Sequence, residues 1–182
     1  MKVTESHLKG VYLIKPQVFE DSRGFFCETY NRDRYKSQGI EVDFVQDNYA
    51  RSCTRGVLRG MHYQIKHGQD KLVWVPQGEV FDVVVDLRKN SPTFGQWDGF
   101  ALSSKNKHQL FVPTGFAHGY CVISETADFM YKCSNFYYPE DEGGLIWNDP
   151  KVGIKWPIED PVLSEKDQNY PTLDKVALPD SN

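Results

Sequence analysis

The stretch EVFDVVVDL, residues 79–87, indicates the fold class of this 182-residue chain. Its apolar residues at positions 81, 83, 85 and 87 share one face of an extended chain, whereas Asp82 and Asp86 lie on the other. This alternation predicts a half-buried strand with its acidic face turned outward.

Similar short runs continue on both sides of this strand, between Val11 and Asn135. Gly, Pro, Asn and Ser separate them, as is typical of turns between strands. Such regular spacing predicts an all-β sandwich or barrel. The runs are VYLIKP, DFVQDN, GVLRGMHYQ, KLVWV, EVFDVVVDL, QLFV, GYCVI and ADFMYKCSNF.

Helical signals are few. Asn31 can cap a short helix over residues 32–38, which Gly39 would end. Beyond Tyr137 the chain is rich in Pro, Gly and acidic residues, so we expect it to wrap over the β body, with one helical turn at residues 164–167. We expect a single domain over residues 1–182, with a loose tail at residues 177–182.

The composition argues against two classes of function, nucleic-acid binding and membrane insertion. With 21 Lys and Arg against 25 Asp and Glu, the net charge of −4 lacks the basic excess typical of nucleic-acid binding. No apolar stretch has the length of a membrane span or signal peptide, and the four cysteines form no C-x-x-C pair, so we expect a cytoplasmic protein with reduced thiols. An anionic ligand would need a local cluster of cations.

Two of the five histidines lie in similar glycine-containing strand patterns, His62 in RGMHYQ and His118 in GFAHGY. A hydrogen-bonded core histidine is the ordinary interpretation of either one alone, but two in matching contexts favour a functional site. Surface placement accounts for His7, His67 and His108, which lie in polar stretches.

The same two histidines allow a comparison with the cupin barrel, a double-stranded β-helix or jelly roll. Pro113, Gly115 and His118 match its second motif, P-x-G-x-x-H, although Val122 replaces the final Asn. In the first motif Gln64 replaces the second histidine, and no acid follows at the required spacing. Since a divalent metal normally needs three or four ligands, the comparison predicts a cupin-type barrel with a few short helices and no metal.

Longer motifs carry a closer resemblance, which covers residues 19–167. These motifs are FEDSRGFFCETY, FVQDN, GVLRGMHYQ, QDKLVWV, GEVFDVVVDLR, SPTFGQW, QLFVPTGFAHGY, YKCSNFYYPEDE, WNDP, WP and LSEKD. With them, the chain resembles the dTDP-4-dehydrorhamnose 3,5-epimerase family, a cofactor-independent branch of the cupins. This resemblance implies inversion of C3 and C5 of dTDP-4-keto-6-deoxy-D-glucose by a homodimer without a cofactor.

The resemblance implies four catalytic roles. His62 is the candidate base, which suits proton removal next to a ketone at neutral pH. Asp167 would orient His62, Lys71 would stabilise the enolate oxygen, and Tyr131 would return a proton to the opposite face of the ring. From the residues alone, a solvated helix-turn acid is the better interpretation of Asp167. A core tyrosine is likewise the better interpretation of Tyr131, because it shares a strand face with Phe129 and Cys133.

The resemblance also implies the substrate contacts. Arg23 and Arg59 match the family's phosphate contacts, and Phe26 with Tyr137 or Tyr138 would stack on the base. Each residue alone could be an ordinary surface residue, so the joint pattern is what carries the hypothesis. The remaining candidates around the substrate are Glu28, Gln46, Asp47, Asn48, His118, Glu142 and Lys166.

Arg59 and His62 raise a geometric problem, because three positions separate them and they would face opposite sides of a regular strand. Either a bulge at Gly60 realigns them or Arg59 serves another part of the ligand. We expect the bulge, because a glycine inside a strand often marks one.

Several functional alternatives stay open from the sequence. A single-site epimerase or ketoisomerase of another deoxysugar nucleotide would use the same residues. A non-catalytic nucleotide-sugar-binding cupin would bind without proton exchange, whereas a metal-dependent oxygenase would hold metal, which the missing second histidine disfavours. An N-terminal edge strand could pair with a second copy to form the expected symmetric dimer.

Overall fold

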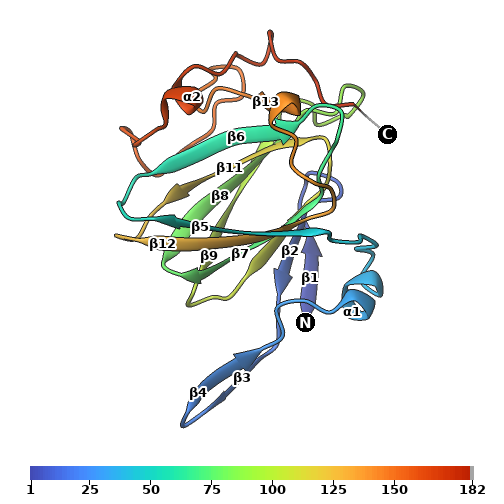
Figure 1. Ribbon diagram of the computed structural model, residues 1–182, viewed down its shortest axis with the longest axis vertical. Helices are drawn as coiled ribbons and strands as arrows, with labels where there is room; N and C mark the ends of the chain where they lie inside the picture. Colours follow the sequence, from blue (N-terminus) through green and yellow to red (C-terminus); the bar gives the residue numbers. More distant parts are fainter. Residues whose placement is uncertain (181–182) are drawn as a thin grey trace.

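The computed structural model describes residues 1–180 and consists mainly of two packed sheets (Figure 1). The six-stranded sheet has the order β1-β2-β10-β7-β12-β5, and the five-stranded sheet has the order β13-β6-β11-β8-β9. The pairs within both sheets are antiparallel, which confirms the all-β prediction. The strands of the six-stranded sheet are β1 (Lys2–Glu5), β2 (Tyr12–Lys15), β10 (Gln109–Val112), β7 (Lys71–Gln77), β12 (Ala127–Cys133) and β5 (Gln46–Ser52), and those of the other are β13 (Glu142–Gly144), β6 (Leu58–Gln64), β11 (Phe116–Val122), β8 (Glu79–Asp86) and β9 (Trp97–Ser103).

The main core lies between the two sheets. Val73 and Phe129 from the six-stranded sheet pack in one buried cluster with Val84, Leu102 and Tyr120 from the five-stranded sheet. Apolar side chains fill one part of the space between the sheets, and polar side chains line a cavity in another part. The barrel therefore supplies both a rigid core and a cavity.

The strand that indicates the fold class, β8, is buried more completely than predicted. Val83 and Val85 pack in a second cluster outside the barrel, and both Asp82 and Asp86 are fully buried. The prediction of an exposed acidic face was therefore wrong. Trp156 and Leu173 of the C-terminal segment pack against this second cluster, which confirms that the segment wraps over the β body.

A side-chain cap begins each α-helix, and the cap at Asn31 confirms the prediction. The Asn31 side chain accepts a hydrogen bond from the Arg34 amide at the start of α1 (Arg32–Lys36), which ends two residues earlier than predicted. The Ser164 hydroxyl accepts one from the Asp167 amide at the start of α2 (Glu165–Gln168). These two caps satisfy backbone donors that the short helices leave unpaired. A single 3-10 turn, η1 (Pro139–Asp141), precedes β13.

A bulge in β6 confirms the expectation for Gly60. His62 pairs with His118 in β11, and Arg59 pairs with Tyr120, so three steps along β6 oppose two along β11. Gly60 has a φ of +129°, and a Cβ there would lie 2.6 Å from the Gly119 Cα. Only glycine fits this close approach, and the extra residue realigns Arg59 with His62.

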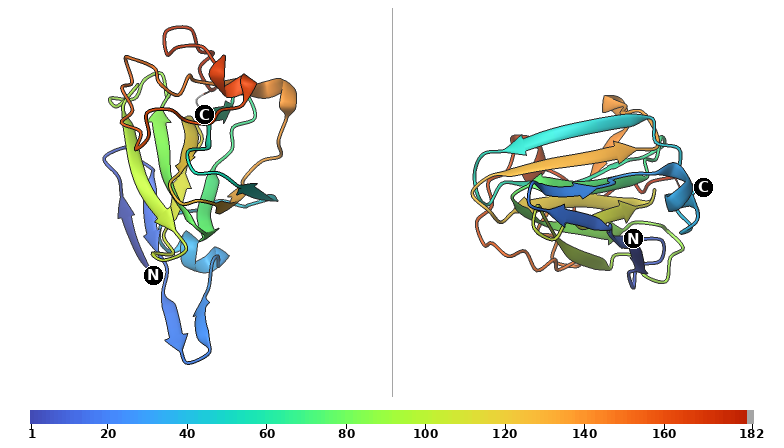
Figure 2. Two further views of the ribbon diagram at one scale, coloured as in Figure 1. Left: turned by 90° about the vertical axis from the view of Figure 1, so that its left-hand side faces the viewer. Right: turned by 90° about the horizontal axis from the view of Figure 1, so that it is seen from below.

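One hairpin, β3 (Val18–Asp21) and β4 (Gly24–Cys27), projects away from the barrel (Figures 1 and 2). The hairpin lies within the motif FEDSRGFFCETY, and its two strands were not predicted. Phe19, Phe25 and Phe26 on this hairpin are 55%, 61% and 67% exposed. Three exposed phenylalanines on an isolated two-stranded ribbon are unusual for a monomer surface.

The described part of the predicted tail makes specific contacts. The Tyr63 hydroxyl donates to the Ala177 carbonyl, and the Asp180 amide donates to the Ile65 carbonyl. Pro179 is buried. The last two residues of the predicted tail, 181–182, lie outside the described residues.

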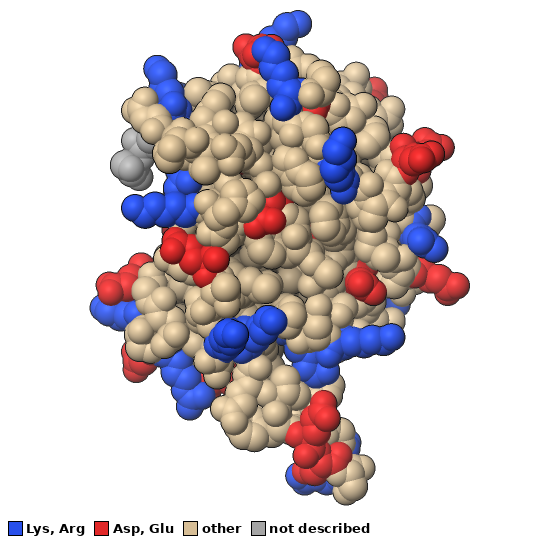
Figure 3. All heavy atoms as spheres, turned by 180° about the vertical axis from the view of Figure 1, so that it is seen from behind, with Lys and Arg blue, Asp and Glu red and all other residues tan. Residues whose placement is uncertain are grey.

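Charged side chains of both signs are interspersed on the face shown in Figure 3. This distribution agrees with the balanced composition, because a nucleic-acid site gathers basic side chains on one face. Across residues 1–180 we find no helix with the length and apolar character needed to cross a membrane.

Candidate active site

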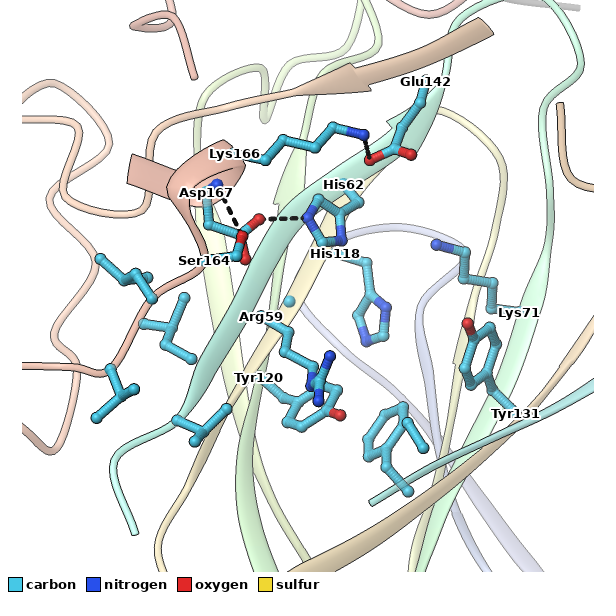
Figure 4. A pocket seen from close by; sticks show the side chains of 17 residues that line it. Arg59, His62, Lys71, His118, Tyr120, Tyr131, Glu142, Ser164, Lys166 and Asp167 are labelled. Atoms are coloured by element: carbon cyan, nitrogen blue, oxygen red, sulfur yellow. Dashed lines mark hydrogen bonds and ion pairs between the residues drawn. The ribbon is translucent and has the colours of Figure 1, made fainter. Parts of the chain in front are cut away.

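The candidate site is a cavity of about 450 Å³ between the two sheets (Figure 4). A neighbouring cavity of about 290 Å³ shares four of its side chains, those of His62, Lys71, Tyr131 and Glu142. Because β6 and β12 belong to different sheets, His62 and Tyr131 approach the cavity from opposite walls. The predicted residues that line the larger cavity are Arg59, His62, Lys71, His118, Tyr131, Glu142, Lys166 and Asp167, and Gln46, Asn48 and Tyr137 line the smaller one.

His62 and Asp167 form the hydrogen-bonded pair that the family resemblance implied. The His62 Nε2 atom lies 2.6 Å from Asp167 Oδ1, and Asp167 is only 4% exposed. The Ser164 cap fixes the helical turn that holds Asp167, so this acid does not lie in solvent. A carboxylate on Nε2 favours the imidazole tautomer with its proton there, which leaves Nδ1 as the proton acceptor.

His118 is the residue opposite His62 in the sheet register, and it has a carboxylate partner of its own. Its Nε2 atom lies 2.9 Å from Asp82 Oδ1, and both side chains are buried. Burial raises the pKa of Asp82, and the His118 imidazole opposes this rise. The pair places a fixed polar group on the cavity floor, which explains why β8 buries Asp82.

Lys71 begins β7, where it pairs with Cys133 of β12, and its ammonium group projects into the cavity (Figure 4). Burial lowers the pKa of Lys71, whereas Cys133 and the carboxylates of Asp82 and Glu142 act in the opposite direction. A buried ammonium group is a strong hydrogen-bond donor to an oxygen that gains negative charge.

Tyr131 lies near Lys71 on the wall formed by the six-stranded sheet (Figure 4). Phe129, Tyr131 and Cys133 line the two cavities, as their shared strand face predicts. Burial, followed by the effects of Cys133 and Tyr120, raises the pKa of Tyr131 to about 12. The hydroxyl is therefore protonated near neutral pH, as a proton donor must be before it reacts.

Glu142 accepts hydrogen bonds from three side chains. Lys166 Nζ and the Tyr170 hydroxyl each lie 2.8 Å from Oε1, and the Tyr137 hydroxyl donates to Oε2. Burial alone would raise the pKa of Glu142, but these hydrogen bonds outweigh it and lower the pKa to about 2. The carboxylate remains charged at neutral pH, at the boundary between the two cavities.

This pKa predicts how Glu142 contributes to acid stability. Since the folded pKa of about 2 lies below the ordinary glutamate pKa of 4.5, the contribution is fully present above pH 4.5 and is lost as the pH falls towards 2. The advantage in Tm of the wild type over Glu142→Gln should therefore shrink across this range. Thermal unfolding at a series of pH values measures it, and an advantage that stays constant down to pH 2 would contradict the assignment.

Gln64 occupies the place of the missing metal-binding histidine, and the structure gives it another role. Its side-chain amide donates to the Tyr138 carbonyl and accepts from the Tyr138 amide, at 3.1 and 2.9 Å. This paired contact fixes the backbone beside Tyr137, which lines the smaller cavity. In residues 1–180, no group of three or more His, Cys, Asp or Glu side chains is arranged to hold a metal ion.

Five predicted substrate residues lie away from both cavities. Arg23 and Phe26 are on the projecting hairpin, and Glu28 pairs with Arg34 of α1. Asp47 faces outward and forms an ion pair with Lys132. The Tyr138 ring stacks on His67 at a centroid distance of 4.1 Å, so Tyr137 is the tyrosine whose side chain faces the site.

Sequence reasoning missed several residues of the site. Tyr120 and Ser164 line the larger cavity, and Gln69 lines the smaller one. Tyr170 contacts both Glu142 and His62. Tyr120 could have been predicted from the G-x-x-H motif. It follows His118 by two positions, and alternate residues of a strand such as β11 face the same side.

Comparison with known proteins places these residues in a family. The family described as dTDP-4-dehydrorhamnose 3,5-epimerase matches residues 5–175. The chain belongs to this epimerase family. A dTDP-4-dehydrorhamnose 3,5-epimerase of Pseudomonas aeruginosa is 55% identical over 170 residues, which cover 92% of this chain and 93% of the relative.

Solved structures of epimerases share the fold. A dTDP-6-deoxy-D-glucose-3,5-epimerase of Legionella pneumophila, in complex with dTDP-4-keto-L-rhamnose, has a TM-score of 0.95 and 46% identity, covering 100% of this chain and 98% of its own. A 3'-monoepimerase of Streptomyces bikiniensis, in complex with dTDP-quinovose, has a TM-score of 0.87 and 33% identity, covering 93% and 86%. The cupin-type barrel is thus confirmed, and the chain is an epimerase of the isomerase class.

Proposed function

We propose that this epimerase inverts C3 and C5 of dTDP-4-keto-6-deoxy-D-glucose to give dTDP-4-keto-L-rhamnose. The observation that carries the proposal is the arrangement of the His62–Asp167 pair on one wall of the cavity and Tyr131 with Lys71 on the other. Inversion needs a base and an acid on opposite faces of the sugar ring, because a base that returns its own proton regenerates the starting isomer.

The chemistry at each carbon proceeds by proton transfer. His62 Nδ1 takes the proton from the carbon next to the ketone, and the electron pair moves onto the ketone oxygen to form an enolate. The Lys71 ammonium group stabilises this oxygen. Tyr131 then gives its hydroxyl proton to the carbon from the opposite side, at least at C5, and proton exchange with solvent restores both residues.

The two cavities suit different parts of a nucleotide sugar. Arg59 and Lys166 line the larger cavity and supply cations for the pyrophosphate. Gln46, Asn48 and Tyr137 line the smaller one and supply amides and an aromatic ring for polar and stacking contacts. His118 contacts the substrate from the floor, and the Glu142 carboxylate accepts hydrogen bonds from sugar hydroxyls.

We also propose a homodimer in which each projecting hairpin reaches the site of the other copy. Arg23 and Phe26 match substrate contacts of the family, yet in one copy they lie away from the cavity. The hairpin's three exposed phenylalanines need an apolar partner surface, and pairing with a second copy would bury them. We place the enzyme in the cytoplasm, where its four free cysteines would stay reduced.

This arrangement predicts complementation between two defective variants. Arg23→Ala should raise KM by about tenfold to hundredfold, the factor expected when one charge-assisted hydrogen bond to phosphate is lost. His62→Asn should lower kcat by about 10² to 10⁴-fold. A mixed dimer has one site with an intact His62 and an intact Arg23 from the other copy. Mixing the two variants after dissociation should therefore restore high-affinity activity.

The mixed sample has a clear control in each variant dissociated and reassociated alone. If the hairpin served its own copy, no mixed dimer would contain an intact site. Activity of the mixture equal to the average of the two variants would then contradict the proposed dimer.

A single-site epimerase is the second candidate, because a 3'-monoepimerase shares the fold at 33% identity. NMR identification of the product from dTDP-4-keto-6-deoxy-D-glucose separates the two reactions. Double inversion gives the L-rhamno product, and a product inverted at one carbon would replace the proposal with the single-site reaction. Binding without any product would support the non-catalytic cupin.

A further inference from the structure

Tyr170, two residues after α2, contacts two groups of the proposed active site. Its hydroxyl lies 2.8 Å from Glu142 Oε1, and its ring meets the His62 imidazole edge-on, with centroids 5.6 Å apart and planes at 69°. Burial, and then the hydrogen bond to Glu142, raise the pKa of Tyr170, so its hydroxyl remains a donor at neutral pH. The family motif LSEKD ends before this residue.

The backbone opposite His62 leaves room for the Tyr170 ring. Gly144 of β13 pairs with His62 of β6, and a Cβ at Gly144 would lie 2.1 Å from both Cδ1 and Cε1 of Tyr170. Gly144 has no positive φ, so its backbone does not require glycine. The close approach of the Tyr170 ring is therefore what restricts this position to glycine.

We propose that Tyr170 is a positioning residue that holds the base His62 and the carboxylate of Glu142 in their reactive places. The ring restricts rotation of the imidazole from one side while Asp167 holds Nε2 from another. The hydroxyl shares Glu142 Oε1 with Lys166, which ties the carboxylate to the segment that carries Asp167. This inference rests on the proposed function of the site.

Two substitutions separate the hydroxyl from the ring. Tyr170→Phe removes only the bond to Glu142, so KM should rise by about threefold to tenfold, as expected for one hydrogen bond, while kcat stays nearly unchanged. Tyr170→Ala also removes the contact with His62. Because a displaced base costs rate rather than affinity, kcat should fall by about tenfold to a hundredfold. If kcat is low in Tyr170→Ala but close to the wild-type value in Tyr170→Phe, the loss of rate comes from loss of the ring and not of the hydroxyl.

Gly144→Ala tests the same contact from the other side. The added methyl group must displace the Tyr170 ring, so kcat should fall as in Tyr170→Ala. In a Tyr170→Ala background the space is free, and the methyl group should cause little further loss. Such non-additivity would show that Gly144→Ala lowers kcat by displacing the Tyr170 ring. If the two sites were independent, the factors by which the two substitutions lower kcat would multiply.

Trp156→Phe is a matched control for the C-terminal segment. The Trp156 Nε1–H donates to the Trp147 carbonyl at 2.8 Å, and its ring packs against the cluster outside the barrel, away from both cavities. This variant should lower Tm with kcat and KM unchanged. A purely structural Tyr170 would behave in the same way.

Kinetics of the wild type, the four single variants and the Gly144→Ala, Tyr170→Ala double variant form one experiment, with Tm measured for each. The inference is supported by a KM effect in the Phe variant, a kcat effect in the Ala variant and non-additivity with Gly144→Ala. It is overturned if the Tyr170 variants change only Tm, or if Gly144→Ala costs the same factor in both backgrounds. A wild type without turnover on the 4-keto sugar would instead contradict the proposed function.

Discussion

His62→Asn should lower kcat by about 10² to 10⁴-fold, the range that a positioned acid-base group contributes. Asparagine keeps a side-chain amide able to hydrogen-bond Asp167 but cannot accept a proton near neutral pH. Because Arg59 and the residues of the smaller cavity remain, the affinity for dTDP should change by less than about threefold. Steady-state kinetics and calorimetric titration with dTDP measure the two effects separately.

A matched control for this substitution is His108→Asn, which changes a partly buried histidine outside the two cavities. It should leave kcat unchanged. Retention of wild-type kcat by His62→Asn would remove His62 as the base. Loss of dTDP affinity together with kcat would show that the substitution had disturbed the cavity as a whole.

Tyr131→Phe should uncouple proton exchange from inversion. The ring and its packing stay, so His62 still removes the proton and Lys71 still stabilises the enolate. Without a donor on the opposite face, His62 returns a solvent-derived proton to the face from which it came. In heavy water, substrate should then gain deuterium with unchanged configuration at C5, while formation of the inverted product falls by about 10² to 10⁴-fold.

The comparison that checks this uncoupling is the ratio of exchange to inversion at C5 in wild type and Tyr131→Phe, measured by proton NMR in one time course. An increase in that ratio is the expected result. If both rates fell by the same factor, Tyr131 would act before or at proton removal. Inversion at the wild-type rate would exclude it as the donor.

Much of the fold could be predicted because its signals are local. Short β-type runs between turn residues identified most of the long strands, although β9 was not predicted, and Asn31 marked the start of α1. The bulge followed from the parity of Arg59 and His62 together with the glycine between them. Burial of both faces of β8 could not be predicted, because the covering residues lie about 70 to 90 positions later.

The site was predictable only where its residues lie within recognisable motifs. The resemblance assigned roles to His62, Lys71, Tyr131 and Asp167, and the structure brings these four together. The contacts of Gln64 with Tyr138 and of Tyr170 with Glu142 join segments with no shared periodicity. The roles of Arg23 and Phe26 depend on an element that leaves the barrel, so one chain alone does not show what they contact.

The central claim is that one cavity removes and returns protons at both carbons next to the ketone. Proton NMR of dTDP-4-keto-6-deoxy-D-glucose with the purified protein in heavy water, against an enzyme-free control, tests it most directly. The account predicts that deuterium enters at C3 and at C5 above the control and that the L-rhamno product accumulates. No incorporation at either carbon would contradict it.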